Sequence, residues 1–308
     1  MCDAAGVLIN GGLVAFPTET VYGLGADACN QKAVARIYSV KGRPADHPLI
    51  VHVASMDSLG DWADDLREYA IALARDYWPG PMTLVVHRSA LAGDFVTGGQ
   101  DTVGVRVPDH PVALGLLEAF ARAGGKGIAA PSANRFGNVS PTTSQAVSAE
   151  LGDYLADSDL IFDGGGCAVG VESTIVDCTG DAPKILRPGA ITQEMIERST
   201  GLHLSGVATQ NQIRVSGSLD AHYAPIATVL LDQTPLAEQG FIAMSDVVTP
   251  DGVVRLAAPQ SHDEFARALY SSLRAADEQG LEVVVVYQPQ GDGIAIAIRD
   301  RLIRAAHC

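Results

Sequence analysis

An apolar run that stops at a proline and leads into a polar loop most constrains the fold of this chain. Leu13–Phe16 has the composition of a buried strand, and Pro17 cannot donate the next ladder hydrogen bond, so the strand ends there. The polar side chains of 18–22 therefore stand just past a strand end, where open α/β sheets usually hold ligands. Gly23 and Gly25 would let the backbone pass close to another surface. The segment predicts either part of a binding site or an ordinary turn with solvated threonines, and taken alone it does not decide between them.

Strands and helices alternate through the N-terminal part of the chain, which is typical of the α/β class. The patterns predict helices at 4–10, from a cap at Asn30 to about 41, at 66–77, from 111 to about 123 and from 192 to about 203. They predict strands at 49–53, 82–86, 102–107, 127–130, 160–162, 173–178 and 183–186.

A change in composition divides the chain into two domains. Residues 204–220 are rich in Ser, Gly, Thr, Gln and Asn without periodicity, which indicates a linker. Beyond it, strands predicted at 227–231, 240–244 and 281–286 alternate with helices at 261–279 and 295–306, which predicts a small parallel, Rossmann-like sheet. We therefore expect a catalytic domain at 1–204, a linker at 205–225 that could act as a lid, and a small α/β domain at 226–308. The second domain has no G-x-G-x-x-G motif to support a dinucleotide role.

Charge and cysteine usage limit the classes of function. The formal net charge of -15 argues against a general nucleic-acid binder, since phosphate contacts need clustered Lys and Arg. The five cysteines are scattered without a C-x-x-C pair, which argues against a disulfide framework or a zinc site and favours a reducing compartment. We see no leader-like N-terminus and no apolar run long enough for a membrane span, so we expect a cytoplasmic protein without membrane contact.

The segment Lys41-Gly42-Arg43-Pro44 places two cations around a glycine at a helix end. Such cations can simply favour the helix dipole. They can also clamp a phosphate, with lysine as a point charge and arginine as a bidentate fork. No G-x-x-x-x-G-K-[ST] motif is present, which excludes a P-loop ATPase.

Polar side chains at further strands add candidates for the same site. Ser132 and Asn134 follow the strand at 127–130, as ligand contacts or as a capped turn. Arg106 lies within an otherwise apolar strand and is expected to face a carboxylate of the protein or of a ligand. His52 is centred in another apolar strand, where a satisfied core histidine is the commoner case. No G-x-S-x-G or H-E-x-x-H motif occurs, so the pattern predicts a pocket that clamps a polyanion without a nucleophile or a protein-held metal.

Six motifs in order resemble the YrdC family and, more narrowly, the long form of threonylcarbamoyl-AMP synthase. They lie at 17–25, 41–44, 101–106, 131–134, 170–174 and 186–189, and the linker adds His222-Tyr223-Ala224-Pro225. The resemblance implies a twisted mixed sheet flanked by helices, followed by a small Rossmann-like domain. It also implies a nucleotidyltransferase that condenses L-threonine, bicarbonate and ATP into threonylcarbamoyl-adenylate and pyrophosphate, for threonylcarbamoyladenosine in tRNA.

The same resemblance implies roles for individual residues by motif position. Lys41 and Arg43 would be the catalytic pair, and we expect both to be exposed in the pocket. L-Threonine would be held by Thr20, His52, Arg106, Ala130 and Ser173; ATP would be held by Arg43, His47, Thr102, Ser132, Asn134, Ser140, Arg187 and Tyr223. Arg106 would take the threonine carboxylate as a bidentate fork that lysine could not replace. Mg²⁺ is expected on the ATP phosphates, and a separate tRNA threonylcarbamoyl transferase is expected to use the product.

Two departures and one alternative accompany this resemblance. Residues 216–221 stand where the family often has a basic segment, and His47 stands where an asparagine is common. The alternative function is a binding module for double-stranded RNA or tRNA, which the acidic charge disfavours. Tyr223, an implied ATP contact within the linker, motivates the hypothesis that the linker closes over the pocket.

Overall fold

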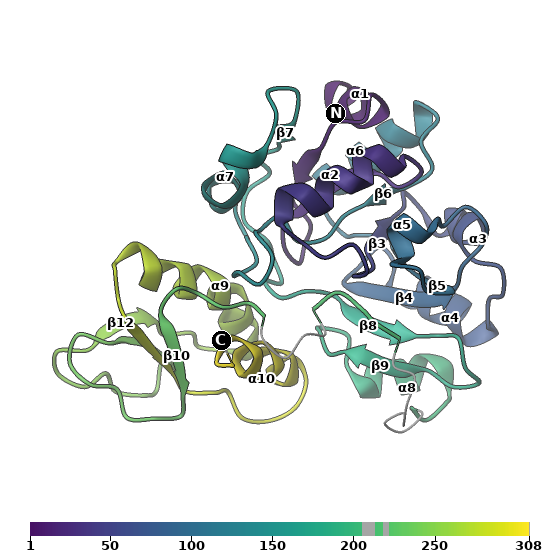
Figure 1. The fold of residues 1–308 in the computed structure, drawn as a ribbon. Helices are drawn as coiled ribbons and strands as arrows, with labels where there is room; N and C mark the ends of the chain where they lie inside the picture. The colour runs from purple at the N-terminus through teal and green to yellow at the C-terminus, as the bar shows by residue number, and fades with distance from the viewer. Residues whose placement is uncertain (205–212, 218–221, 308) are drawn as a thin grey trace.

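A mixed sheet of nine strands organises the larger part of the molecule (Figure 1). The computed structural model describes residues 1–204, 213–217 and 222–307. The strands run in the order β7-β1-β2-β6-β3-β5-β4-β8-β9, with parallel and antiparallel neighbours in the same sheet. This arrangement confirms the expected mixed α/β sheet.

The strands of this sheet are β1 (Val14–Phe16), β2 (Gly23–Asp27), β3 (Ile50–His52), β4 (Met82–His87), β5 (Thr102–Arg106), β6 (Ile128–Ala129), β7 (Leu160–Ile161), β8 (Thr174–Asp177) and β9 (Lys184–Arg187). The helices are α1 (Cys2–Ile9), α2 (Gln31–Lys41), α3 (Leu59–Trp62), α4 (Glu68–Tyr77), α5 (Asp94–Thr97), α6 (Pro111–Arg122), α7 (Ser144–Leu151) and α8 (Gln193–Thr200), with short 3₁₀ turns at Met56–Ser58 and Gly152–Tyr154.

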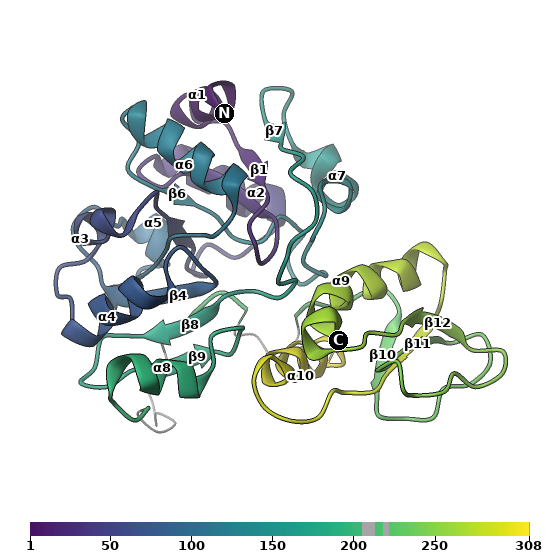
Figure 2. The same ribbon diagram turned by 180° about the vertical axis from the view of Figure 1, so that it is seen from behind.

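Helices cover the two faces of this sheet unequally. Residues of α2, α4, α7 and α8 share one hydrophobic core with the sheet, whereas α1 and α6 pack on the opposite face beside β1 and β6. The first group includes α2, which lies in front of the sheet in Figure 1, and α6 lies in front in Figure 2. On the second face, the half formed by β3, β5, β4 and β8 carries linker residues instead, with Val215 packed on Val85 and Ile175. This half is where a ligand can reach the sheet.

Strand alternation selects the side chains that this open half presents. β3 and β5 are parallel, with Ile50 opposite Gly104 and His52 opposite Arg106. The intervening residues, among them Val51 and Val105, are buried in the core on the other face. Because successive side chains point to opposite faces, the polar residues of both strands share one face.

The C-terminal domain has a four-stranded parallel sheet in the order β10-β13-β11-β12, as expected for a small Rossmann-like unit. Its elements are β10 (Thr228–Leu231), β11 (Gly240–Ile242), β12 (Val254–Ala257), α9 (His262–Glu278), β13 (Val283–Val286) and α10 (Ile294–Ala305). The helices α9 and α10 lie on the side that faces the large domain (Figures 1 and 2). They share a core with Val21, Val139 and Val171 of the large domain, so the two domains are packed together.

Several local predictions are confirmed and others are corrected. Asn30 caps α2 by accepting from two backbone amides, and Ser261 caps α9. Residues 23–27 form strand β2, which pairs with β1, whereas the sequence reading treated the glycines only as a loop. A Cβ on Gly25 would lie 2.7 Å from Ile128, so the expected close approach does occur. α7 and β12 were not predicted. Residues 205–212 and 218–221 of the predicted linker lie outside the described part of the chain.

Candidate active site

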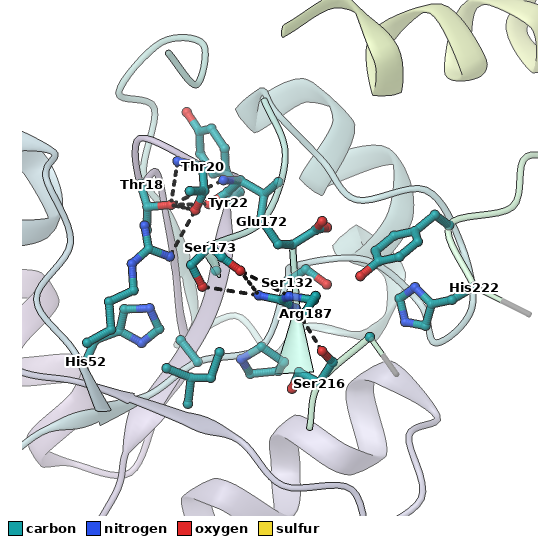
Figure 3. Close-up of a pocket in the computed structure, with 18 of the residues that line it drawn as sticks. Thr18, Thr20, Tyr22, His52, Ser132, Glu172, Ser173, Arg187, Ser216 and His222 are labelled. Atoms are coloured by element: carbon teal, nitrogen blue, oxygen red, sulfur yellow. Dashed lines mark hydrogen bonds between the residues drawn. The ribbon is translucent and has the colours of Figure 1, made fainter. Parts of the chain in front are cut away.

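A pocket lies on the open half of the large sheet and is bordered by Ser216 and His222 of the linker (Figure 3). It encloses about 50 Å³ and is lined by Thr18, Thr20, Val21, Tyr22, Gly23, Arg43, Ile50, His52, Arg106, Ala130, Pro131, Ser132, Glu172, Ser173, Arg187, Ser216, Gly217, His222 and Tyr223. These residues come from strands, from the loops beside them and from the linker. Ser216 contacts both Arg43 and Arg187 at one end of this pocket.

One end of the pocket is built by the loop between β1 and β2 and by Arg106. The Thr18 hydroxyl donates to the Val21 carbonyl at 2.7 Å and contacts the Thr20 hydroxyl at 2.8 Å. Arg106 Nη1 donates to Thr20 Oγ1 at 3.0 Å. Because the Thr18 hydroxyl already donates its proton to Val21, the Thr20 hydroxyl must donate to Thr18. The Thr20 oxygen can then only accept a hydrogen bond from a ligand in the pocket.

Arg106 faces a carboxylate of the protein, as its place in an apolar strand predicts. Its Nη2 lies 2.6 Å from Glu19 Oε1, and both side chains are only 5% exposed. Its Nε donates to the Gly80 carbonyl at 3.3 Å. Nη2 makes no aligned hydrogen bond within the described residues although it is buried. Nη1 uses one of its two N–H groups on Thr20, and Arg106 lines the pocket, so the guanidinium keeps capacity for a second anion.

His52 stands beside this pair as a neutral imidazole. Burial and the neighbouring charge of Arg106 lower the pKa of His52 to about 3. It packs edge-on to Phe16 at 6.1 Å, and its Nδ1 has no hydrogen-bond partner among the described residues. His52 can thus contact a ligand without adding charge at neutral pH.

The burial of His52 makes the fold sensitive to mild acid. Between the ordinary pKa of 6.5 and the folded value of about 3, the unfolded chain binds a proton that the folded chain does not. Stability should therefore fall as the pH drops below 6.5, by up to about 1.4 kcal/mol per pH unit for this residue. Urea titrations near pH 6 and 5 should show a smaller pH dependence in His52→Gln than in the unmodified chain. Equal pH dependence in the two proteins would contradict this assignment.

The other end of the pocket holds two arginines on either side of the linker. Arg187 donates through Nε and Nη2 to the Ser173 carbonyl at 3.1 and 2.9 Å, and through Nη1 to the Ser216 carbonyl at 2.8 Å. Arg43 Nη2 donates to Ser216 Oγ at 3.2 Å and to the Pro48 carbonyl at 3.1 Å. Ser216 of the linker thus contacts both guanidiniums, and Figure 3 shows its contact with Arg187.

The charge of this pocket is opposite to that of the protein. Arg43, Arg106 and Arg187 line it, and Glu172 is the single carboxylate among the described residues of its lining. Burial is the main cause that lowers the pKa of Arg43 to about 10, and the charge of Arg187 contributes. Arg43 and Arg187 both contact Ser216, and neither forms an ion pair among the described residues, which predicts a site for an anion with several charges.

The structure corrects the expectation that Lys41 and Arg43 are exposed. Both are buried, at 2% and 7% exposure, and only Arg43 lines the pocket. Lys41 Nζ donates to the carbonyls of Ser132, at 2.6 Å, and Asn134. It reaches the site by holding the loop that carries Ser132, and its direct catalytic role stays a prediction.

Lys41 should therefore contribute to stability as well as to activity. Lys41→Met leaves two carbonyls without a charged donor, so we expect a loss of about 1–3 kcal/mol in the free energy of unfolding. Lys32→Met, an exposed position on the same helix, should change it by less than about 0.5 kcal/mol. Urea unfolding followed by circular dichroism measures both. Equal stability of Lys41→Met and the unmodified chain would show that these two bonds are not stabilising.

The structure brings most of the other predicted residues to the pocket and places a few behind its wall. Ala130, Ser132, Ser173 and Tyr223 line it directly. Four lie outside its lining: Thr102, in the adjoining cavity under Val215; Ser140, hydrogen-bonded to Glu172; Asn134, bonded to the carbonyls of Arg135 and Asn138; and His47, edge-on to Phe136. Contact of these four with ATP stays a prediction.

Sequence reasoning assigned no role to several residues that line the pocket. Thr18 and Tyr22 were noted at the strand end without a function, and Glu172 was only part of a motif. His222 was named within the linker motif 222–225 and Ser216 within the departure at 216–221, but neither was given a role. Among the residues described, no group of three or more His, Cys, Asp or Glu side chains could hold a metal ion. Within the same residues, no helix combines the length and apolar character needed to cross a membrane.

Comparison with known proteins places this geometry in a family. The family model Sua5_yciO_yrdC, described as telomere recombination, matches residues 6–189, and the C-terminal domain of threonylcarbamoyl-AMP synthase matches residues 191–307. The chain belongs to the Sua5/YciO/YrdC family. The second match places it with the members of that family that carry the additional C-terminal domain.

Relatives of this family align over nearly the whole chain. The threonylcarbamoyl-AMP synthase of Pyrococcus abyssi is 39% identical, with 98% of this chain and 93% of that protein covered. The threonylcarbamoyl-AMP synthase of Bacillus subtilis is 38% identical, with 99% and 92% covered. The crystal structure of P. abyssi Sua5 complexed with L-threonine superposes with a TM-score of 0.87 at 38% identity, covering 99% of this chain and 93% of that one.

Proposed function

We infer that this chain is a threonylcarbamoyl-AMP synthase. It condenses L-threonine, bicarbonate and ATP into threonylcarbamoyl-adenylate and releases pyrophosphate. The observation that carries this conclusion is the distribution of arginines in one pocket. Arg106 is placed to bind a carboxylate at one end, and Arg43 and Arg187 are placed to bind a polyanion at the other. Full-length similarity to threonylcarbamoyl-AMP synthases, one of them solved with L-threonine, supports the same reaction.

The threonine end fits a zwitterionic amino acid. The free N–H groups of Arg106 would bind the threonine carboxylate, with Glu19 behind it keeping the guanidinium in place. Thr20, which has only acceptor capacity left, would take an N–H or O–H from the substrate. The neutral His52 and the small side chain of Ala130 complete the wall without a further charge.

The reaction requires positioning and charge neutralisation more than covalent catalysis. Bicarbonate takes up a proton and loses water to give CO₂, and the threonine amine adds CO₂ and releases a proton to give a carbamate. One carbamate oxygen then attacks the α-phosphorus of ATP while pyrophosphate leaves. Arg43 and Arg187 would hold the phosphates and neutralise charge that develops on them. Ser132 and Tyr223, which line the pocket, would border the nucleotide once Ser216 has moved off the arginines.

Mg²⁺ would act through the nucleotide. Glu172, the carboxylate in the pocket wall, forms an ion pair with Arg301. The described residues also contain no cluster of acidic side chains that could hold the ion. The cation would be carried by triphosphate oxygens and water, where it shields phosphate charge. The steps assigned above to Arg43 and Arg106 do not depend on where it lies.

A substrate-omission assay tests the proposed function. Pyrophosphate release from ATP should require both L-threonine and bicarbonate, and omission of either should reduce it to background. Release that continues without threonine would contradict the assignment.

A separate transferase would carry the threonylcarbamoyl group to tRNA, because the net charge of -15 opposes tight binding of tRNA by this chain.

A further inference from the structure

We propose that Arg301 and Tyr270 of the C-terminal domain are positioning residues for the nucleotide half of the site: they bind the Glu172 carboxylate and so keep Arg187 available for phosphate. This inference rests on the proposed function. It assigns to the small domain a contribution to the chemistry of the pocket.

The Glu172 carboxylate is the point where the two domains meet at the pocket wall. Its Oε1 accepts from Ser140 Oγ at 2.6 Å. Its Oε2 accepts from Tyr270 Oη on α9 at 2.9 Å and from Arg301 Nε on α10 at 2.9 Å. The Glu172 side chain is 8% exposed and that of Arg301 is 0% exposed. Two of its three side-chain donors thus come from the other domain.

Glu172 stays ionised because the small domain supplies its counter-charge. Burial alone would raise its pKa, but the charges of Arg301 and Arg187, with the hydrogen bonds from Ser140 and Arg301, lower the pKa to about 2. Arg301 is itself held by Asp300, whose carboxylate lies 2.7 Å from Nη1, and its guanidinium lies over the Tyr223 ring at 5.5 Å. The carboxylate therefore keeps a full charge beside the anion site.

This charge would work against nucleotide binding if Arg301 were absent. Arg187 is close enough to Glu172 for its charge to lower the pKa of the carboxylate, yet its N–H groups go to Ser173 and Ser216. Without Arg301, the uncompensated carboxylate would draw Arg187 out of the position from which it can bind phosphate. Arg301 consequently acts on the phosphates through Glu172, without touching them.

The contact between Arg301 and Glu172 does more than hold the two domains together. Buried ion pairs are often replaceable by apolar groups without loss of stability, so their presence at an interface is not explained by stability alone. The domains have a second ion pair, the partly buried Arg274 with Glu150 at 2.9 Å, whose side chains are 15% and 13% exposed. Neither residue lines the pocket. That pair provides the matched control for a role in docking.

Binding measurements on the full-length chain separate the two roles. Calorimetric titration with ATP and, separately, with L-threonine should be made on Arg301→Met, Arg274→Met, Tyr270→Phe and the double variant Glu172→Gln/Arg301→Met, with circular dichroism as the folding check. We expect Arg301→Met to weaken ATP binding at least about tenfold while threonine binding changes less than about twofold. Tyr270→Phe should weaken ATP binding in the same direction by a smaller factor.

The double variant decides between positioning and docking. Neutral glutamine no longer competes for Arg187, so Glu172→Gln/Arg301→Met should bind ATP more tightly than Arg301→Met alone. No recovery in the double variant, or an equal loss in Arg274→Met, would overturn the proposal. Because ATP binding is measured without turnover, a chain that binds ATP but forms no adenylate would refute the proposed function and leave this test intact.

Discussion

Arg43→Ala should lower kcat/KM for ATP by about 10²–10³, the range found when one preorganised donor to a developing oxyanion is removed. Arg43 is buried at the pocket wall, and its Nη1 has no partner among the described contacts. Its charge would therefore be available to the phosphates once Ser216 moves. Alanine removes that charge and the fork at once, and a neighbouring lysine cannot replace them, because Lys41 is bonded to two carbonyls.

A control on α2, the helix that ends just before Arg43, separates the effect of the Arg43 charge from general effects of removing a cation. Lys32→Ala removes an exposed cation of α2 and should leave kcat/KM within about twofold of the unmodified chain. Initial rates of pyrophosphate release at varied ATP, with threonine and bicarbonate saturating, measure both variants. If Arg43→Ala retained the unmodified rate, Arg43 would not be a phosphate ligand.

Arg106→Lys should weaken L-threonine binding by about 10²-fold, the cost of losing one fully desolvated charge-assisted contact. The Arg106 guanidinium contacts three protein groups: the Thr20 hydroxyl, the Gly80 carbonyl and the Glu19 carboxylate. An ammonium on a flexible stem can pair with Glu19 but cannot keep these contacts and also bind a carboxylate bidentately. The substitution retains the net charge, so the effect isolates geometry.

Calorimetry with each substrate checks this prediction. ATP binding to Arg106→Lys should stay within about twofold, because Arg43 and Arg187 hold the phosphates. Arg88→Lys, at a partly exposed arginine paired with Asp94 at 2.6 Å, is the matched substitution away from the pocket and should alter neither affinity. Threonine binding of unchanged strength in Arg106→Lys would place the carboxylate elsewhere.

Local sequence patterns predicted the strands that carry the site and the side chains that stand at their ends. The strands predicted at 49–53 and 102–107 are observed as β3 and β5, and they place His52 opposite Arg106. The residues alone favoured a core histidine at position 52, and only the resemblance implied a contact with threonine. The apolar surroundings of Arg106 also predicted a carboxylate partner, which the structure shows to be Glu19. These inferences succeed because they depend on the period of a strand and on the cost of burying a lone charge.

What the sequence could not predict depends on contacts between distant residues. The spacing of Lys41 and Arg43 does not reveal that the lysine is buried and bonded to the 132–134 loop, while the arginine lines the pocket. Nothing local marks Arg301 as the partner of Glu172, because the pair joins residues far apart in the chain, across a domain boundary. The strand at 23–27 was missed for a related reason: its glycines read as a turn until pairing with β1 and β6 is known.

The central claim is that one pocket joins threonine, CO₂ and ATP, and isotope incorporation tests it most directly. The chain would be incubated with L-threonine, ATP and ¹³C-bicarbonate, and the masses of the nucleotide products would be measured by mass spectrometry. We expect threonylcarbamoyl-adenylate heavier by about one mass unit than the product from unlabelled bicarbonate, consistent with a single carbamate carbon between the amine and the phosphate. An adenylate that carries no label, or the absence of any threonine-containing adenylate from an active, folded preparation, would contradict the account.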